Sequence, residues 1–225
     1  MTPGNGQRGG GQKPPPVVYE QQLADEPQWA LREGSEHFEG RSAVQDALRR
    51  IVQRLEALGV AYAVSGGMAL FRHGVRRFTE DVDVLVDRDG LRTIHEQLAG
   101  RGYVPLFEGS RGLRDAELGV RIEFLVAGEY PGDGEPKPVA FPSPDTVSQD
   151  LDGLRCLTLH ALIELKLASG ISSPDRLKDL ADVQELIKTL GLPANLAEQL
   201  DPWVQEKYRE LWASSRGGAP EVPST

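Results

Sequence analysis

The sequence predicts an α+β protein in which a mixed sheet is flanked by helices and followed by an α-helical C-terminal part. Three observations indicate this architecture. A long stripe of apolar residues with helical spacing comes first, and short runs with alternating valines and brief helical segments follow it. From residue 157 to 212 the patterns are helical only. With 225 residues, 39% of them hydrophobic, the chain can bury the core of one domain.

A first helix is expected over residues 42–58. Ser42 is a suitable N-cap, and Gly59 ends the helix because glycine readily leaves the helical backbone conformation. The apolar residues of this segment recur at helical spacing, which places them on one face. They are Val44, Leu48, Ile51, Val52, Leu55 and Leu58.

In the middle of the chain, strands alternate with short helices. Strands are expected at 60–64, 79–86 and 119–126, with a shorter extended segment at 103–107. Helices are expected at 68–73 and 92–100, and the Gly-, Pro- and Asp-rich residues 128–153 are expected to form a long loop with some extended pieces. The C-terminal helices are expected at 157–168, 173–189, 192–200 and 202–212.

The two ends of the chain lack the apolar residues that a core needs. Residues 1–40 begin with a Gly-, Pro- and Gln-rich stretch and are expected to be disordered or weakly ordered. Residues 213–225 are expected to form a flexible tail for the same reason. Between the ends, residues 41–155 are expected to form the core domain and residues 156–212 a helical region.

Composition excludes several classes of protein. The 25 basic and 34 acidic residues give a net charge of -9, which argues against coating nucleic acid through bulk positive charge. No apolar run approaches the roughly 18–20 residues that span a bilayer, so no membrane partner is expected. The first 16 residues hold no apolar core of a secretory signal, so a cytoplasmic location is expected. The single cysteine, Cys156, excludes an intramolecular disulfide.

A pair of acids is the strongest candidate for chemistry. Asp81 and Asp83 are two residues apart in a predicted strand, so both carboxylates project from one face, roughly 6.5–7 Å apart along the chain. Two like charges at this distance need a neutralising cation, and ligands that are all oxygen favour Mg²⁺ or Mn²⁺. The alternative is a solvated edge strand that ends in acids.

Other residues near the pair suit a phosphate ligand. Gly66 and Gly67, after Ser65, form a strand-to-helix turn whose backbone can approach a phosphate, although a plain tight turn is the alternative. Arg77 lies between the glycines and the acids, where a triphosphate needs positive charge, unless it belongs to a solvated basic face. Glu123 lies amid apolar residues on a later strand, where it meets a metal or a partner or else faces solvent.

Together these residues resemble the nucleotidyltransferase superfamily that shares the polymerase-β palm. The pattern is a Gly-Gly turn, thirteen residues, Asp81-Val82-Asp83 and a later acid, and it covers about residues 45–127. The resemblance implies a palm-like mixed sheet, an NTP substrate, and Mg²⁺ or Mn²⁺ ions held by Asp81 and Asp83. It also implies that Glu123 shares one metal and helps deprotonate the acceptor hydroxyl. The triphosphate then lies against a set of nucleotide-binding residues that includes Ser65, Gly66, Gly67 and Arg77.

The C-terminal half extends the resemblance to about residue 190. Lys166, then Arg176, then Lys178-Asp179-x-x-Asp182 is similar to the AbiEii-type nucleotidyltransferases, known mostly as toxins of toxin–antitoxin pairs. This implies that Lys166, with Arg176 or Lys178, stabilises charge on the leaving pyrophosphate. Asp179 and Asp182 orient these bases or the incoming nucleotide. It also implies an RNA acceptor, particularly a tRNA end, or a protein hydroxyl, and a cognate antitoxin protein as partner. Taken alone, the same residues fit ordinary surface charge on amphipathic helices.

Two other functions stay open. A small-molecule acceptor, as in the antibiotic-modifying nucleotidyltransferases that share the motif, is the rival within the enzyme class. A catalytically silent protein of the same fold, which binds a nucleotide or a partner protein, is the rival outside it. Metal-dependent turnover separates the silent protein from either enzyme.

Overall fold

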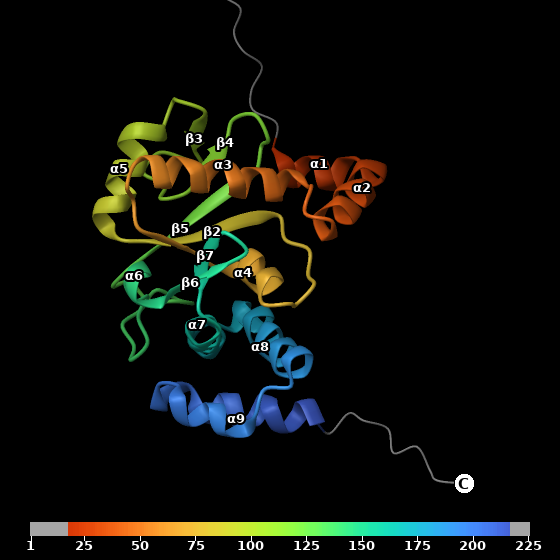
Figure 1. Cartoon of the computed structure of the whole chain (residues 1–225), viewed down its shortest axis with the longest axis vertical. Coiled ribbons are helices and arrows are strands. Elements are labelled where there is room, and N and C mark those ends of the chain that lie inside the picture. Colours follow the sequence, from red (N-terminus) through yellow and green to blue (C-terminus); the bar gives the residue numbers. More distant parts are fainter. Residues whose placement is uncertain (1–17, 217–225) are drawn as a thin grey trace, which may run out of the picture.

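A seven-stranded mixed sheet forms the centre of the computed structural model, which describes residues 18–216 (Figure 1). Its strand order is β3-β4-β5-β2-β1-β7-β6, and the β2–β5 and β1–β7 pairs are parallel whereas the other pairs are antiparallel. The strands are β1 (Tyr62–Val64), β2 (Asp81–Val86), β3 (Tyr103–Pro105), β4 (Leu113–Asp115), β5 (Arg121–Val126), β6 (Ser148–Leu151) and β7 (Leu154–Leu157). The predicted tails at 1–17 and 217–225 lie outside the described residues.

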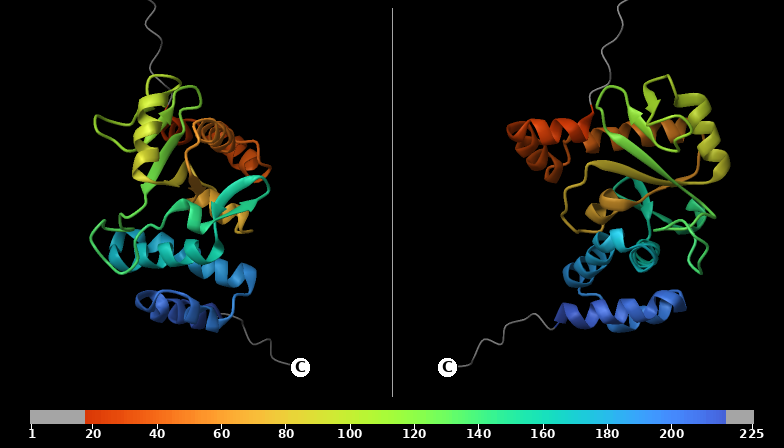
Figure 2. Two further views of the ribbon diagram at one scale, coloured as in Figure 1. Left: turned by 60° about the vertical axis from the view of Figure 1, so that its left-hand side comes forward. Right: turned by 180° about the vertical axis from the view of Figure 1, so that it is seen from behind.

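Helices cover both faces of this sheet. Helices α3 (Ala43–Ala57) and α5 (Arg88–Leu98) lie against one face, and α7 (Leu159–Ser172) and α8 (Leu177–Leu190) against the other. Helix α9 (Pro202–Arg216) packs outside α7 and α8, at the opposite end of the molecule from the N-terminal helices (Figures 1 and 2). The shorter elements are α4 (Gly66–Arg72), α6 (Pro144–Val147) and two 3₁₀ helices, η1 (Pro174–Arg176) and η2 (Ala194–Gln199). Within residues 18–216, no helix is long and apolar enough to cross a membrane.

The alternation of side chains along β2 creates two cores. Val82, Val84 and Val86 are buried with α3 and α5, whereas Leu85 is buried with α7 and α8 on the opposite face. Because successive strand residues point to opposite faces, Asp81 and Asp83 share the face of Leu85. The acids therefore lie on the face of α7 and α8 rather than on that of α3 and α5.

The predicted fold class is confirmed: a mixed sheet is flanked by helices and followed by a helical C-terminal part. The bounds of the elements differ from the expected ones in several places. Residues 154–157 form β7 because they pair with β6 and β1, and the helix begins only after Thr158, whose hydroxyl accepts from the Ala161 amide. The predicted helix at 192–200 is a 3₁₀ helix over Ala194–Gln199, and the predicted loop contains α6 and β6.

Residues 19–38 form two helices, although the sequence led us to expect a disordered or weakly ordered segment there. They form α1 (Tyr19–Asp25) and α2 (Pro27–Phe38). Tyr19 is fully buried, donates a hydrogen bond to Glu33 (3.0 Å) and meets Trp29 edge-on at 5.4 Å. The pair of helices is therefore held by a few large contacts, which hydrophobic periodicity does not reveal. Residues 213–216, expected in the C-terminal tail, form the last turn of α9.

A buried histidine joins α2 to the chain segment that precedes β2. The side chain of His37 is fully buried, and its Nε2 lies 3.1 Å from the carbonyl oxygen of Arg77, to which it donates. Its ring also meets Phe71 and Phe78 edge-on, with centroids 5.6 and 5.1 Å away. The N-terminal helices thus fix the path of the backbone between the glycine turn and the acids.

Burial lowers the pKa of His37, although the Arg77 carbonyl and Glu33 oppose this shift. Below about pH 6.5 His37 is protonated in the unfolded chain but stays neutral in the folded protein. The stability that neutral His37 contributes is therefore lost as the pH falls. We expect His37→Gln to reduce the free energy of unfolding by about 1–3 kcal/mol at pH 7.5. The difference in the free energy of unfolding between wild type and His37→Gln should become smaller as the pH falls to 5.

Urea unfolding at both pH values measures this gap. His95→Gln is the control, because His95 also lies beside a carbonyl, that of Arg111 (2.9 Å), but in an exposed position. A gap for His37→Gln that stays constant between pH 7.5 and 5 contradicts the prediction.

Candidate active site

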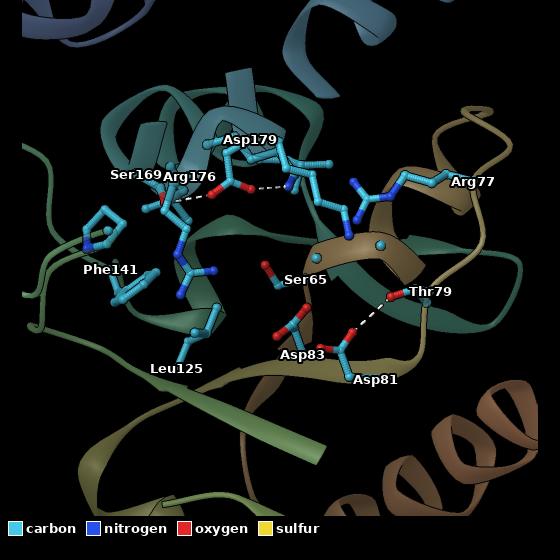
Figure 3. A pocket seen from close by; sticks show the side chains of 18 residues that line it. Ser65, Arg77, Thr79, Asp81, Asp83, Leu125, Phe141, Ser169, Arg176 and Asp179 are labelled. Carbon is cyan, nitrogen blue, oxygen red and sulfur yellow. Dashed lines mark hydrogen bonds and ion pairs between the residues drawn. The ribbon is translucent and has the colours of Figure 1, made fainter. Parts of the chain in front are cut away.

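The parallel pairing of β2 with β5 brings the predicted acids together. In its register Asp83 lies beside Glu123, and Asp81 lies beside Arg121. Since aligned residues of neighbouring strands point to the same face, all four side chains lie on the face that meets α7 and α8. Figure 3 shows Asp81 and Asp83 projecting from β2 into the cleft, with Ser65 above them.

Each aspartate has a different environment. Asp81 accepts hydrogen bonds from Thr79 (2.9 Å) and from Arg121 (2.8 Å). Burial raises the pKa of Asp83 to about 7, and the negative charges of Asp81 and Glu123 add to this effect. Burial also raises the pKa of Glu123. Burial and the charge of Asp81 thus disfavour the ionised forms of both Asp83 and Glu123.

The glycine turn and Asp83 form one close-packed unit. Gly66 has φ +57°, and a Cβ atom on it would lie 1.8 Å from Oδ2 of Asp83. A Cβ atom on Gly67 would lie 2.6 Å from Cβ of Thr79, and the Ser65 amide donates to the Asp83 carbonyl (2.8 Å). The sequence suggested glycine for contact with a phosphate, and the structure adds that only glycine fits beside the acid.

A buried ion cluster joins α7 to α8. Lys166, whose side chain is 10% exposed, donates to Asp179 and to Asp182, both at 2.8 Å. Ser169 also donates to Asp179 (2.6 Å), and Arg77 pairs with Asp182. Burial by itself would raise the pKa of Asp179, but Lys166 and Ser169 outweigh it and keep this pKa below its usual value. The positive charge of Lys166 is thus already neutralised.

Two predicted bases are available for a ligand. Arg176 and Lys178, at the start of α8, line the cleft with exposed side chains. Within residues 18–216, neither forms an ion pair. In Figure 3 the guanidinium of Arg176 points down into the cleft, toward the level of the acids.

Two adjoining clefts collect the predicted residues. The first has a volume of about 210 Å³ and lies between the glycine turn, β2 and α7. Of the predicted residues it contains Ser65, Gly66, Gly67, Arg77, Asp81, Asp83, Lys166, Arg176, Lys178 and Asp179. The second, of about 630 Å³, shares Asp81, Asp83 and Arg176 and contains Glu123. Asp182 lines neither cleft and lies behind Lys166.

Sequence reasoning missed the loop that forms one wall of both clefts. Pro131, Gly132 and Phe141 line both, and they belong to the segment expected only as a long loop. The loop packs tightly on α7, because a Cβ atom on Gly132 would lie 2.2 Å from Oγ of Ser172. Two aromatic residues, Tyr130 and Phe141, in a Gly- and Pro-rich loop were the available signal. Arg121 was also missed, although its position two residues before Glu123 places it on the same strand face.

The acids are suited to a hard cation but do not form a preorganised cage. Within the described part of the chain, no group of three or more His, Cys, Asp or Glu side chains is arranged to hold a metal ion. The donors of Asp81, Asp83 and Glu123 are all carboxylate oxygens on one face of the paired strands β2 and β5, and burial and mutual repulsion disfavour the charge of Asp83. This donor chemistry fits Mg²⁺ or Mn²⁺.

No protein-family model matches the chain, and no curated protein sequence matches it significantly. Several solved structures resemble part of it. ANT(2'')-Ia in complex with adenylyl-2''-tobramycin has 14% identity over 76% of this chain and 96% of its own, with a TM-score of 0.47. An antigenic nucleotidyltransferase-like protein from Paracoccidioides brasiliensis has 14% identity over 74% of this chain and 85% of its own, with a TM-score of 0.44. JHP933 from Helicobacter pylori has 17% identity over 76% of this chain and 88% of its own, also with a TM-score of 0.44. A likeness this weak carries no statement about reaction or substrate.

The close packing of Gly66 on Asp83 predicts a specific sensitivity to a single methyl group. Gly59 is the matched control, since its φ of +66° is similar but nothing lies within 4 Å of its Cβ position. We expect Gly59→Ala to reduce the free energy of unfolding by roughly 1–2 kcal/mol through backbone strain alone. Gly66→Ala should lose at least about 1 kcal/mol more, because the carboxylate must move. Equal losses in urea unfolding experiments contradict the contact.

The raised pKa of Asp83 predicts that a neutral isostere stabilises the metal-free protein. The folded pKa of about 7 lies above the usual value of 3.8, so the cost of the charge grows as the pH rises between these values. At pH 8 in EDTA, Asp83→Asn should melt about 2 °C or more above the wild type. The difference should vanish toward pH 4.

Thermal melts across this pH range measure the effect. Asp89→Asn is the control, because Asp89 is exposed at the start of α5. A lower melting temperature for Asp83→Asn at pH 8 means that the charge is already compensated.

Proposed function

We propose that the protein is a metal-dependent nucleotidyltransferase that transfers an NMP from an NTP to an acceptor hydroxyl and releases pyrophosphate. The observation that carries this proposal is the convergence of three features on one cleft: the glycine turn, the acid pair and the available bases. Each feature has a plain structural explanation by itself. Their meeting on one face of the sheet, from segments about 100 residues apart, is what the reaction requires.

In this proposal Asp81 and Asp83 hold Mg²⁺ or Mn²⁺, and Glu123, beside Asp83, completes the carboxylate set. When bound, the metal neutralises triphosphate charge and lowers the pKa of the attacking hydroxyl. Glu123 accepts the proton of that hydroxyl, and its raised pKa suits a proton acceptor. Thr79 holds the carboxylate of Asp81 in place, and in the metal-free protein Arg121 donates to the same carboxylate.

The other residues orient the triphosphate. Ser65, Gly66 and Gly67 border the cleft at the start of α4, where backbone amides favour phosphate oxygens. Arg176 and Lys178 stabilise the charge that develops on the leaving pyrophosphate.

The buried ion cluster has a supporting role in this scheme. The sequence resemblance implies direct catalysis by Lys166, but its ammonium is held by two aspartates. We therefore assign Lys166, Asp179 and Asp182 to fixing α8 against α7, so that the two available bases face the acids. Arg77 belongs to the same cluster through Asp182.

Two classes of acceptor fit the larger cleft. Its volume of about 630 Å³ suits a small hydroxyl compound, and its lining includes the further acids Glu129 and Asp133. Together with the net charge of -9, this favours a small-molecule acceptor over extensive contact with RNA. An RNA acceptor such as a tRNA end, with a toxin role and a cognate antitoxin, is the second candidate. It needs only the terminal ribose to enter the cleft.

Incubation of the protein with each α-labelled NTP and Mg²⁺ or Mn²⁺ tests the reaction. The acceptors are deproteinised total RNA, a panel of polyhydroxylated amines and sugars, and the protein alone. Label should move to one acceptor class with release of pyrophosphate. The Asp81→Asn/Asp83→Asn protein should lose at least about 100-fold in rate.

The matched control is Asp46→Asn/Asp89→Asn, which removes the same charge at exposed positions of α3 and α5. Label in RNA selects the second candidate, and label in a small compound the first. Protection against thermal unfolding by an NTP, with no transfer or pyrophosphate release in any arm, overturns the enzyme and identifies a silent binding protein.

A further inference from the structure

Arg121 lies inside the acid cluster that the proposed function assigns to the metal. Its Nη2 donates to Oδ2 of Asp81 at 2.8 Å, and its Nε lies 3.5 Å from Oε1 of Glu123. The guanidinium therefore contacts two of the three carboxylates that would receive a divalent cation. The register explains this position, because Arg121 is directly opposite Asp81 on the neighbouring strand.

A third carboxylate lies near Nε of the guanidinium. Glu20, on α1, lies 3.7 Å from Nε of Arg121 and pairs with Arg114 at 2.7 Å. Helix α1 is itself anchored to the start of β5, since the Tyr19 amide donates to the Gly119 carbonyl (3.2 Å). Arg121 thus lies between the acids of the sheet and an acid of the N-terminal helix.

The guanidinium is incompletely bonded in this position. Its Nε is buried and makes no hydrogen bond within the described residues, although two carboxylates lie within 4 Å of it. An arginine fixed for structural reasons alone would ordinarily satisfy this donor. A small movement away from Asp81 would bring Nε toward Glu20, so the side chain can change partners without crossing open solvent.

We propose that Arg121 is a tethered counter-cation that neutralises the acids in the metal-free protein and moves toward Glu20 when a divalent cation binds. It thereby sets the metal affinity of the site. This inference rests on the proposed function, because it needs a metal at Asp81 and Asp83. Arg121 is accordingly a positioning residue, and Glu20 gives the N-terminal helix a direct influence on the reaction centre.

Binding of Mn²⁺ to the nucleotide-free protein tests the proposal, by titration calorimetry or by electron paramagnetic resonance of free Mn²⁺. Arg121→Gln removes the competing charge and should bind Mn²⁺ about tenfold more tightly than the wild type. Arg121→Lys keeps the charge and should stay within about twofold. Arg111→Gln is the matched control, because Arg111 lines the same cleft but pairs with Glu129. This variant should change the Mn²⁺ affinity less than about threefold.

A double-mutant cycle tests the partner. Glu20→Gln should weaken Mn²⁺ binding about threefold in the wild type, because the displaced guanidinium loses its acceptor. In the Arg121→Gln background the same change should have little effect. Glu129→Gln, which removes an acid from the same cleft, controls for the loss of negative charge as such.

The possible results separate two failures. If wild type and variants alike bind no Mn²⁺ without nucleotide, the inference fails, and the transfer assay with labelled NTP decides the proposed function separately. If the wild type binds Mn²⁺ and Arg121→Gln binds it equally or less tightly, only the inference fails, and Arg121 serves to orient Asp81. Equal effects of Glu20→Gln in both backgrounds overturn the role of Glu20.

Discussion

The rest of the structure depends on three carboxylates that lie close together on one half-buried face of the sheet. Asp81, Asp83 and Glu123 are held side by side by the backbone hydrogen bonds of β2 and β5, so they cannot separate to relieve their repulsion. Charge that is close and poorly hydrated must be met by cations or by protonation. Burial raises the pKa of Asp83, the charge of Asp81 raises it further, and Lys166 and Arg121 oppose this shift.

The cations of this face have separate duties. Arg121 partly neutralises the negative charge of these acids. Lys166 instead forms ion pairs with Asp179 and Asp182 and so links α7 to α8. Arg176 and Lys178 stay available at the mouth of the cleft. The basic residues nearest the acids are already in ion pairs, whereas Arg176 and Lys178 are available for a ligand. This arrangement suits a ligand that brings both a cation and negative phosphate groups.

The acids and the glycine turn could be predicted from sequence because their signals are local. Alternation along one strand places Asp81 and Asp83 on one face, whatever the neighbouring strands do. The contact of Arg121 with Asp81 depends instead on the register between strands 40 residues apart, which no local pattern encodes. Helices α1 and α2 were not predicted, because they have no stripe of apolar residues at helical spacing. Single large contacts, such as that of Tyr19 with Glu33, hold them in place.

The packing of Gly66 against Asp83 also has an evolutionary consequence. A larger side chain at position 66 collides with the carboxylate, so it becomes acceptable only after position 83 has shrunk. That first change removes the acid. Any lineage selected for the acid therefore keeps the glycine, even if no ligand ever touches position 66. The two positions are epistatic, and the first glycine of the Gly-Gly signature would persist as a by-product of selection on an aspartate seventeen residues away.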